Sequence, residues 1–329
     1  MRDRSRAASA LRLVCWVGGF GLGVLMVGAT YQWMSHRRDL RENPAPGKLV
    51  DVGGYRMHLD CTGEGSPTVI LDSGLSDSSL SWFKVQPQIA GFTRVCSYDR
   101  AGLGWSDPSP YARESKIFAE ELHTLLHNAG IQPPLILVGH SMGGFDVLIY
   151  AGLHPEEVKG MVLVDSAYPD LANRLPKLKT SLSEWRRSLE REEYGMRFGV
   201  TRALGRCGVG TPELTPKLRT VECDMSWIQE TIAECRSMWD ASAAEAGSVD
   251  SLGSIPLIVI SEDPAKNSSE FLPEFEKGQE ALMRLSTDGS RVTAVGSGHQ
   301  IQKERPDLVV SSVRRVWEET QDSAEPTVR

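Results

Sequence analysis

Ser141 lies at the centre of a Gly-x-Ser-x-Gly motif whose two glycines are Gly139 and Gly143. The apolar run 135–138 precedes the motif and predicts a buried strand, and the apolar spacing in 145–153 predicts a helix after it. A strand, a tight turn and a helix in this order are the context of a nucleophile elbow. The turn strains the serine, so its neighbours must be small. We therefore expect the Ser141 hydroxyl at a helix N-terminus, where backbone N–H groups favour developing negative charge.

A base and an acid for this serine are sought further along the chain. A serine hydroxyl is a poor nucleophile at neutral pH and needs a base that a carboxylate orients. His299 is the last histidine and ends a Gly-Ser-Gly-His sequence directly after a predicted strand. Asp263 follows the strand after a long insertion, where the acid is expected, and is the preferred candidate. Asp165, which ends the preceding strand, and Glu262 stay as alternatives.

The sequence Asp-Ser-Gly-Leu at 72–75 is a candidate oxyanion-hole loop. Gly74 would let the backbone turn so that the N–H of Leu75 points at a developing oxyanion. The N–H of Met142, directly after the serine, would be the second donor. One such donor stabilises a transition state by about 3 kcal/mol.

The elements that must position these residues alternate between strands and helices. Gly53-Gly54 joins the predicted strands 48–52 and 55–61 as a hairpin turn. Apolar strands and an amphipathic helix then alternate, which predicts an α/β fold with a mostly parallel sheet covered on both faces. The further predicted strands are 67–71, 93–98, 135–138, 160–164, 255–261 and 291–295, and the predicted helices are 114–129, 145–153, 274–285 and 306–319.

Residues 168–254 interrupt this alternation with several helical patterns and no strong strand. The insertion leaves the sheet directly after a strand end, where ligands bind in such folds, and so predicts a helical lid. Residues 43–167 and 255–320 would form the core, and 321–329 a fraying tail.

Residues 13–34 form an apolar segment with no charged side chain. At ~1.5 Å per residue the segment is about 33 Å long as a helix, enough to cross a bilayer. Arginines flank both ends, and those before it favour an N-inside orientation with the following domain outside the cytoplasm. Residues 1–42 would then comprise a cytoplasmic flank, a membrane anchor and the start of a linker that runs from residue 39 to residue 48. A signal peptide cleaved near Val27-Gly28-Ala29 is the main alternative, and a buried helix is a third interpretation.

The bulk composition excludes some classes of protein. The net charge of −7 gives no basic footprint for nucleic acid. Cysteine spacing predicts no metal site, and the chemistry above needs no cofactor. A Cys61–Cys96 bridge is possible, while Cys207, Cys223 and Cys235 could supply a second bridge and a free thiol, with the pairing open. The sequence also leaves the oligomeric state open.

Three motifs together resemble the α/β-hydrolase fold superfamily: Val-Gly-His-Ser-Met-Gly-Gly around Ser141, Tyr-Asp-Arg-Ala-Gly-Leu-Gly-Trp-Ser-Asp at 98–107, and Gly-Ser-Gly-His ending at His299. The resemblance covers residues 48–319 and is to the capped, serine-dependent, esterase-like branch of bacterial type. It implies an eight-stranded sheet. From the residues themselves, Asp99 is expected to cap its own loop and to pair with Arg100. The chain departs from the common pattern at Ser73, where a histidine usually precedes the glycine.

The resemblance implies a serine hydrolase that cleaves a carboxylic ester or a related small acyl substrate through an acyl-enzyme on Ser141. Haloalkane dehalogenases and epoxide hydrolases of this fold carry an aspartate at the elbow, which Ser141 argues against. Amidase, peptidase, thioesterase, acyltransferase and carbon–carbon hydrolase chemistry use the same side chains and remain alternatives. A non-catalytic binding protein on the same fold is the alternative from another class.

Overall fold

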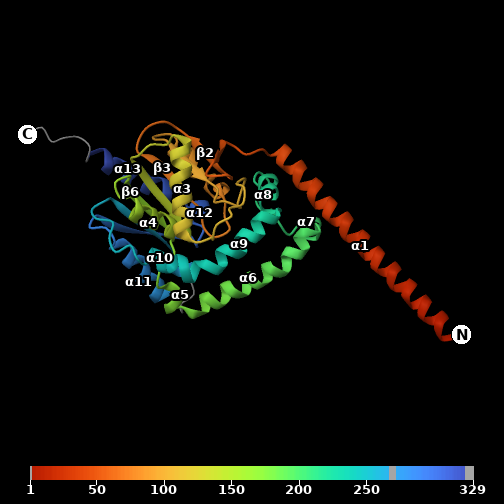
Figure 1. Ribbon diagram of the computed structural model, residues 1–329. Helices are drawn as coiled ribbons and strands as arrows, with labels where there is room; N and C mark the ends of the chain where they lie inside the picture. The colour runs from red at the N-terminus through yellow and green to blue at the C-terminus, as the bar shows by residue number, and fades with distance from the viewer. Residues whose placement is uncertain (1, 267–271, 323–329) are drawn as a thin grey trace, which may run out of the picture. The chain divides into compact units, whose positions relative to one another are not determined.

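The computed structural model describes residues 2–266 and 272–322. Contacts within the chain divide it into two units. The first unit comprises Met1–Pro44 and Ser188–Ile228, and the second comprises Ala45–Arg187 and Gln229–Arg329. The second unit contains the sheet, whose strands are drawn as arrows in Figure 1, and it also contains all candidate catalytic residues.

One eight-stranded sheet organises the second unit, in the order β1-β2-β4-β3-β5-β6-β7-β8. The β1–β2 and β2–β4 pairs are antiparallel, and every later pair is parallel. The mostly parallel α/β sheet and the hairpin around Gly53-Gly54 are thus confirmed. The strands are β1 (Lys48–Asp51), β2 (Arg56–Thr62), β3 (Thr68–Asp72), β4 (Val95–Tyr98), β5 (Leu135–His140), β6 (Val158–Val164), β7 (Leu257–Glu262) and β8 (Gly289–Ala294).

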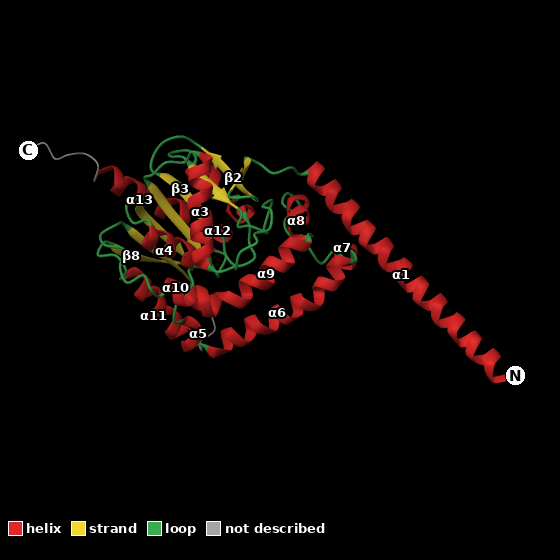
Figure 2. Cartoon of the chain, in the orientation of Figure 1, coloured by secondary structure: helices red, strands yellow, loops and turns green. Residues whose placement is uncertain are grey.

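Helices cover both faces of this sheet because successive strand side chains point to opposite sides. On one face, Ile70 and Leu137 pack with residues such as Phe118 from the helices α3 (Ser115–Ala129) and α4 (Gly143–Leu153). On the other face, Val69 and Val138 pack against the helices α2 (Gln86–Ile89), α12 (Ile301–Glu304) and α13 (Pro306–Asp322). Strands buried on both sides explain the continuous apolar runs in the sequence. Helices and strands can be distinguished in Figure 2.

The helices of the second unit are α2 (Gln86–Ile89), α3 (Ser115–Ala129), α4 (Gly143–Leu153), α5 (Leu171–Arg174), α10 (Ala243–Ala246), α11 (Leu272–Met283), α12 (Ile301–Glu304) and α13 (Pro306–Asp322), with short turns η1 (Ser79–Trp82), η2 (Met238–Ser242) and η3 (Pro264–Lys266). The helices that lie wholly or partly in the first unit are α1 (Arg2–Glu42), α6 (Pro176–Arg197), α7 (Val200–Ala203), α8 (Thr215–Glu222) and α9 (Met225–Ser237).

The structure differs from the predictions at both ends of the chain. The linker expected from residue 39 is wrong at its start, because α1 continues as helix to Glu42 and Asp39 is buried within the first unit. At the other end, α13 includes residues 321 and 322 of the expected tail. Residues 323–329 of that tail lie outside the described part of the chain.

Two disulfides resolve the open cysteine pairing. Cys61 on β2 bonds to Cys96, its register partner on β4. Cys207 bonds to Cys223 within the first unit, which leaves Cys235 as a buried free thiol. Cystines of this kind are typical of proteins outside the cytoplasm.

Candidate active site

Ser141 occupies the sharp turn between β5 and α4. Its φ of +52° lies in the left-handed region, which a side-chain-bearing residue adopts only when its surroundings enforce it. Here the Ser141 N–H donates to the Val164 carbonyl at 3.2 Å, and the Ser141 carbonyl accepts from the N–H groups of Gly144 and Ala167. The side chain remains partly accessible. The geometry is that of the nucleophile elbow predicted from the motif.

The glycines of the motif are required by close packing. A Cβ on Gly139 would lie 2.6 Å from the Gly143 carbonyl oxygen. A Cβ on Gly143 would lie 2.6 Å from the Ser73 carbonyl oxygen. Real Cβ atoms do not approach backbone so closely, so any larger residue would force the turn apart. This explains the spacing of the two glycines around Ser141.

His299 links the serine to a carboxylate by hydrogen bonds. Its Nε2 lies 3.0 Å from Ser141 Oγ, and its Nδ1 lies 2.6 Å from Asp165 Oδ2. Because the ionised Asp165 can only accept, the proton on His299 is assigned to Nδ1. Nε2 is then free to accept the proton of the Ser141 hydroxyl. The three side chains form the arrangement that acyl transfer by a serine requires.

Asp165 directly follows β6 and is held from several sides. Its carboxylate is 1% exposed, and its Oδ1 accepts the backbone N–H of Glu262 at 2.8 Å. Its own N–H donates to the Ile260 carbonyl at 2.7 Å, and its φ is +43°. Like Ser141, Asp165 has a strained backbone conformation, which indicates that the surrounding fold fixes the position of its carboxylate.

The preference for Asp263 as the acid is wrong in this geometry. The Asp263 carboxylate accepts the N–H groups of Ala265 at 2.9 Å and Gly296 at 2.7 Å, and no contact joins it to His299. It braces the loop that carries the histidine, and these backbone hydrogen bonds lower its pKa. Glu262 lines the hollow at the site, but it orients Asp165 through its backbone. Asp165 is the candidate whose carboxylate hydrogen-bonds to the imidazole.

The electrostatics of His299 follow from this pairing. The protein atoms around the half-exposed imidazole by themselves lower its pKa, but the hydrogen bond and charge of Asp165 outweigh this and raise the pKa above its ordinary value. A raised pKa makes the ring a stronger base. The ring must still be neutral at Nε2 to accept the serine proton, so activity should fall as the pH drops through this pKa.

His140, the residue before the serine, has a positioning role that the motif alone did not reveal. Its Nε2 lies 3.0 Å from the His299 carbonyl oxygen, and the two rings lie 4.8 Å apart. Burial, with the nearby His299, holds the pKa of His140 well below its ordinary value. A neutral ring that donates from Nε2 therefore ties the His299 loop to the elbow.

The candidate oxyanion loop lies against the elbow. A Cβ on Gly74 would lie 3.2 Å from Ser141 Cβ and 2.8 Å from His140 Nδ1, so the loop passes directly over the nucleophile. Within the described residues, the N–H groups of Leu75 and Met142 donate to no other protein group. Both donors therefore remain available to an oxyanion.

Arg100 fixes this loop from beneath. The guanidinium is 2% exposed and donates to the Ser73 and Gly74 carbonyls at 2.6 and 2.7 Å. It also donates to Asp72 Oδ1 and to Glu234 Oε1. The expected pairing of Arg100 with Asp99 is wrong. Asp99 instead pairs with the buried His58 at 2.8 Å.

The buried network around Arg100 contains more carboxylates than arginines. Burial raises the pKa of Asp72 to about 6, against the charge of Arg100. Burial also raises the pKa of Asp146 well above its ordinary value, and the neighbouring Asp72 adds to this. Glu230, which pairs with Arg113, has its pKa raised by burial to about 8. The loop over the nucleophile is therefore supported by a dense network of buried charged groups. In the sequence, the 98–107 motif was the one pattern that pointed to this network.

Two hollows open beside Ser141 within the second unit. The first, of about 310 Å³, has Ser141, Asp165 and His299 on one side. Glu262 also lines it, and its remaining walls are apolar: Ala167, Leu171, Leu175, Leu178, Met238, Trp239 and Phe275. The second, of about 400 Å³, shares Leu178, Met238 and Trp239 with the first and adds both apolar and polar side chains: Leu75, Leu182, Trp185, Asp77, Ser181 and Gln300. Two largely apolar spaces thus meet at the nucleophile.

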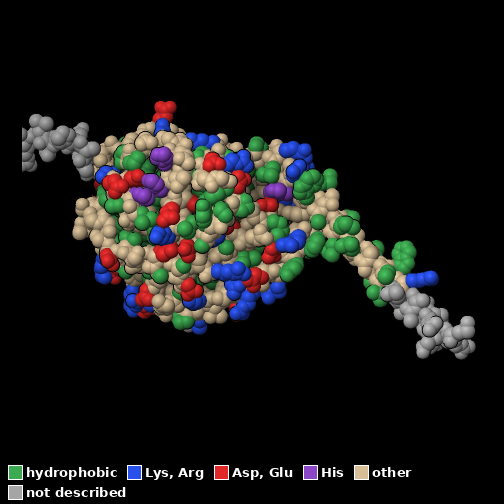
Figure 3. Space-filling view, in the orientation of Figure 1, with side chains coloured by type: hydrophobic (Ala, Val, Ile, Leu, Met, Phe, Trp, Pro, Cys, Tyr) green, Lys and Arg blue, Asp and Glu red, His purple; other side chains and the backbone are tan. Residues whose placement is uncertain are grey.

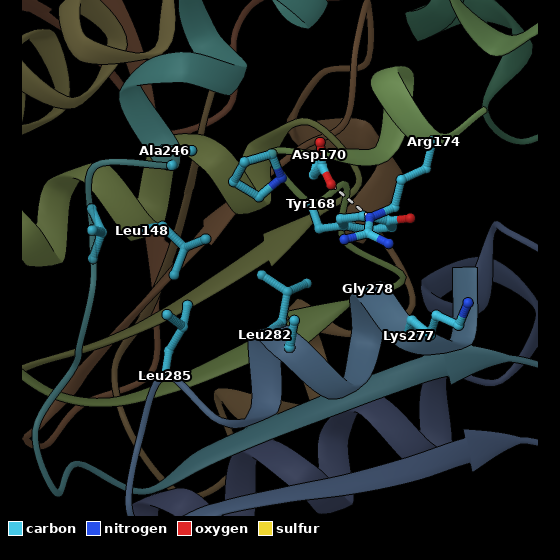
Figure 4. A pocket seen from close by; sticks show the side chains of 13 residues that line it. Leu148, Tyr168, Asp170, Arg174, Ala246, Lys277, Gly278, Leu282 and Leu285 are labelled. Carbon is cyan, nitrogen blue, oxygen red and sulfur yellow. Dashed lines mark ion pairs between the residues drawn. The ribbon is translucent and has the colours of Figure 1, made fainter. Parts of the chain in front are cut away.

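A separate apolar hollow lies beside Tyr168 and Leu282 (Figure 4). It holds the Asp170–Arg174 ion pair and none of Ser141, Asp165 or His299 lines it. Because this hollow has no nucleophile, we identify the candidate active site by its reactive side chains and not by the shape of a hollow.

His123, His154 and Glu157 gather ligand-type atoms within 4.8 Å of one another, a cluster the sequence did not reveal. The two imidazoles stack at 3.9 Å, and Glu157 bonds to His123 and to the Tyr150 hydroxyl. These contacts account for the cluster without a metal ion.

Comparison with known proteins agrees with this architecture. Residues 67–202 match a family model described as the alpha/beta hydrolase fold. A thermophilic esterase from Thermogutta terrifontis has a similar structure, with a TM-score of 0.63, 22% sequence identity, and coverage of 83% of this chain and 98% of that chain. Together these findings show that the chain has the α/β-hydrolase fold.

The curated relatives have low sequence identity to this chain or match only part of it. The chain is 24% identical over 274 residues to the uncharacterized protein YqjL of Bacillus subtilis, which covers 82% of this chain and 91% of that protein. It is 33% identical over 141 residues to the probable transporter efuK of Hormonema carpetanum. That match covers 39% of this chain, and the chain spans only 20% of the length of that relative.

Proposed function

We propose that the protein is a serine hydrolase that cleaves a carboxylic ester or a related acyl compound. The observation that carries the proposal is the hydrogen-bonded series Ser141–His299–Asp165, which opens onto an apolar hollow. Asp165 replaces the acid first expected from the sequence.

The reaction divides into two acyl transfers. Ser141 Oγ attacks the carbonyl carbon while its proton passes to Nε2 of His299, and Asp165 stabilises the resulting imidazolium. The negative charge on the carbonyl oxygen is held by the N–H groups of Leu75 and Met142. His299 then protonates the leaving alcohol. Water that His299 deprotonates next attacks the acyl-enzyme, releases the acid and restores Ser141.

The walls of the site favour a substrate with apolar parts. Apolar side chains dominate both hollows, and burial of apolar area in them is favourable. Each hollow therefore suits an apolar substituent of an acyl substrate on one side of Ser141. Amide, thioester or carbon–carbon bond cleavage would use the same groups, and only a substrate panel distinguishes them.

We also propose that α1 anchors the protein in a membrane with the second unit outside the cytoplasm. The segment Arg12–Glu42 contains an apolar window long enough to cross a bilayer. The arginines before the span favour this orientation, and the two disulfides fit an oxidising compartment.

A panel of p-nitrophenyl esters and matching anilides tests the function on the full chain in detergent. Ester hydrolysis by the wild type that disappears in Ser141→Ala supports the proposal. Ser311→Ala is the matched control, because Ser311 is exposed on α13 and lines neither hollow at Ser141. Hydrolysis that survives in folded Ser141→Ala, or a folded wild type inactive on the whole panel, would overturn it.

A further inference from the structure

The two halves of α1 have different surroundings. From Arg12 to Val27 the side chains are almost all exposed, with Trp16 at 78% and Phe20 at 76% (Figure 3). From Gly28 onward one face of the helix is covered by the rest of the first unit. A long bare apolar helix in water is unfavourable, so the first half needs a lipid or protein environment.

The covered face of α1 is built for a close and specific contact. A Cβ on Gly28 would lie 2.5 Å from the Phe198 carbonyl oxygen. Gln32 is 6% exposed and donates to the Cys223 carbonyl at 2.7 Å. Asp39, 7% exposed, pairs with the buried Arg202. These three α1 positions are four and seven residues apart, which places them on one face of the helix.

Arg12 is the last charged residue before the apolar segment, and the bare part of α1 that follows it, up to Val27, is too short to span a bilayer alone. Residues 12–27 extend about 24 Å as a helix, whereas the hydrocarbon core of a bilayer is about 30 Å thick. About four more residues are needed, which brings the edge of the hydrocarbon to Tyr31. Any tilt of the helix brings still more residues into the membrane. Gly199 lies beside Tyr31 there, since its Cβ would be 2.7 Å from the Tyr31 ring.

Apolar and aromatic side chains are exposed at this level. Val200 and Leu204 are 50% and 59% exposed and lie four residues apart, on one side of α7 and its end. Trp33 is 56% exposed, and the Arg37 guanidinium lies over its ring at 4.4 Å. Aromatic rings backed by arginine are typical of the boundary between lipid and water. We call Tyr31, Trp33, Val200 and Leu204 the interfacial patch.

We propose that the interfacial patch is seated in the outer boundary layer of the bilayer, with Val200 and Leu204 in contact with lipid. The inference rests on the proposed membrane anchoring of α1 and extends it to part of the predicted lid. Lipid is the occupant that the geometry favours, because the patch continues the bare apolar surface of α1 at the depth where the helix is still within the membrane. The lid segment 198–204 is then a membrane-bound element.

Site-specific fluorescent labels test this in the full chain, reconstituted in phosphatidylcholine vesicles whose acyl chains carry bromine as a quencher. Cys15→Ser removes the exposed free thiol, and Cys235 is buried. Labels are then introduced singly at Phe20→Cys in the span, Leu204→Cys in the patch and Lys217→Cys as control. Lys217 is exposed on α8, and Thr220 of the same helix bonds to the Asp39 carbonyl. Asp39 is about 12 Å beyond Tyr31 along α1, so a label at 217 should lie outside the hydrocarbon.

The inference predicts that brominated lipid quenches the labels at 20 and 204 to a comparable extent and leaves the label at 217 unaffected. Quenching at 20 without quenching at 204 would overturn the inference while the anchor survives. No quenching at 20 would overturn the anchor itself and the seating with it. Neither result would change the ester hydrolysis measured in detergent. The proposed hydrolase function and the proposed membrane seating can therefore be refuted independently.

Discussion

Replacement of Asp165 by asparagine separates the acid that the geometry selects from the acid that the sequence favoured. The asparagine keeps the acceptor for the Glu262 N–H but places an amide near Nδ1 of His299. An N–H group facing Nδ1 favours the tautomer with its proton on Nε2. That nitrogen then cannot accept the Ser141 proton, so turnover should collapse while the fold persists.

The expected loss is large because proton transfer itself is blocked. The equivalent change in a serine protease lowers kcat by about 10⁴-fold, which corresponds to about 5.4 kcal/mol of transition-state stabilisation. The hydrogen bond of 2.6 Å and the 1% exposure of Asp165 support a loss of this order here. The pKa of His299 should also fall, because the charge that raises it is gone. The acid limb of the residual rate therefore moves to lower pH.

The assay is kcat/KM for the best p-nitrophenyl ester from about pH 5 to about pH 9, a range that brackets histidine titration. Asp263→Asn is the matched control, and it should stay within about tenfold of wild type because it contacts no reacting group. Thermal unfolding of both variants checks the fold. A larger loss in Asp263→Asn than in Asp165→Asn, or an unchanged acid limb in Asp165→Asn, would refute the reasoning.

Three further changes probe the supports of the site. Gly74→Ala should lower kcat/KM by about ten- to a hundredfold with little effect on melting, because the new Cβ meets Ser141 and His140; an unchanged rate would show that the loop has room. Arg100→Met should reduce the free energy of unfolding in urea by about 3–5 kcal/mol, since it strands buried acids, and an unchanged midpoint would contradict this. Burial lowers the pKa of His58, but the charge of Asp99 outweighs it and leaves the pKa raised. The stability from protonated His58 is therefore present at low pH and lost as pH rises through that pKa, so melting temperatures of His58→Gln should depend less on pH above about 6.5.

The sequence was sufficient to predict the fold, and it pointed to two of the three side chains that the structure brings together at the candidate site. Buried apolar strands and regular helices report their own structure through local periodicity, and Ser141 and His299 sit in glycine-rich turns with strong local signals. The choice of acid was different. β6 and β7 are parallel neighbours, so Asp165 and Asp263 follow strands that end at the same edge of the sheet. Only the backbone turn at each strand end decides which carboxylate reaches the imidazole.

Long-range contacts were beyond the reach of sequence patterns for another reason. Gln32 and Asp39 look like the end of a membrane segment and its linker, yet they are buried against Arg202 and Cys223, more than 150 residues away. Sequence alone suggests that a chain without residues 1–42 should be a soluble, active domain. The structure predicts instead that this truncation leaves Arg202 buried without its acid, which destabilises the first unit. Limited proteolysis of the truncated protein should cut within 188–228.

The central claim is that Ser141 is a nucleophile activated by His299. The direct measurement is reaction of the full-length protein with a fluorophosphonate, followed by mass spectrometry of its peptides. The account predicts one phosphonyl adduct, on Ser141, formed far more slowly in His299→Ala and absent in Ser141→Ala. An adduct on another residue, or no adduct on a folded wild-type protein, would contradict it.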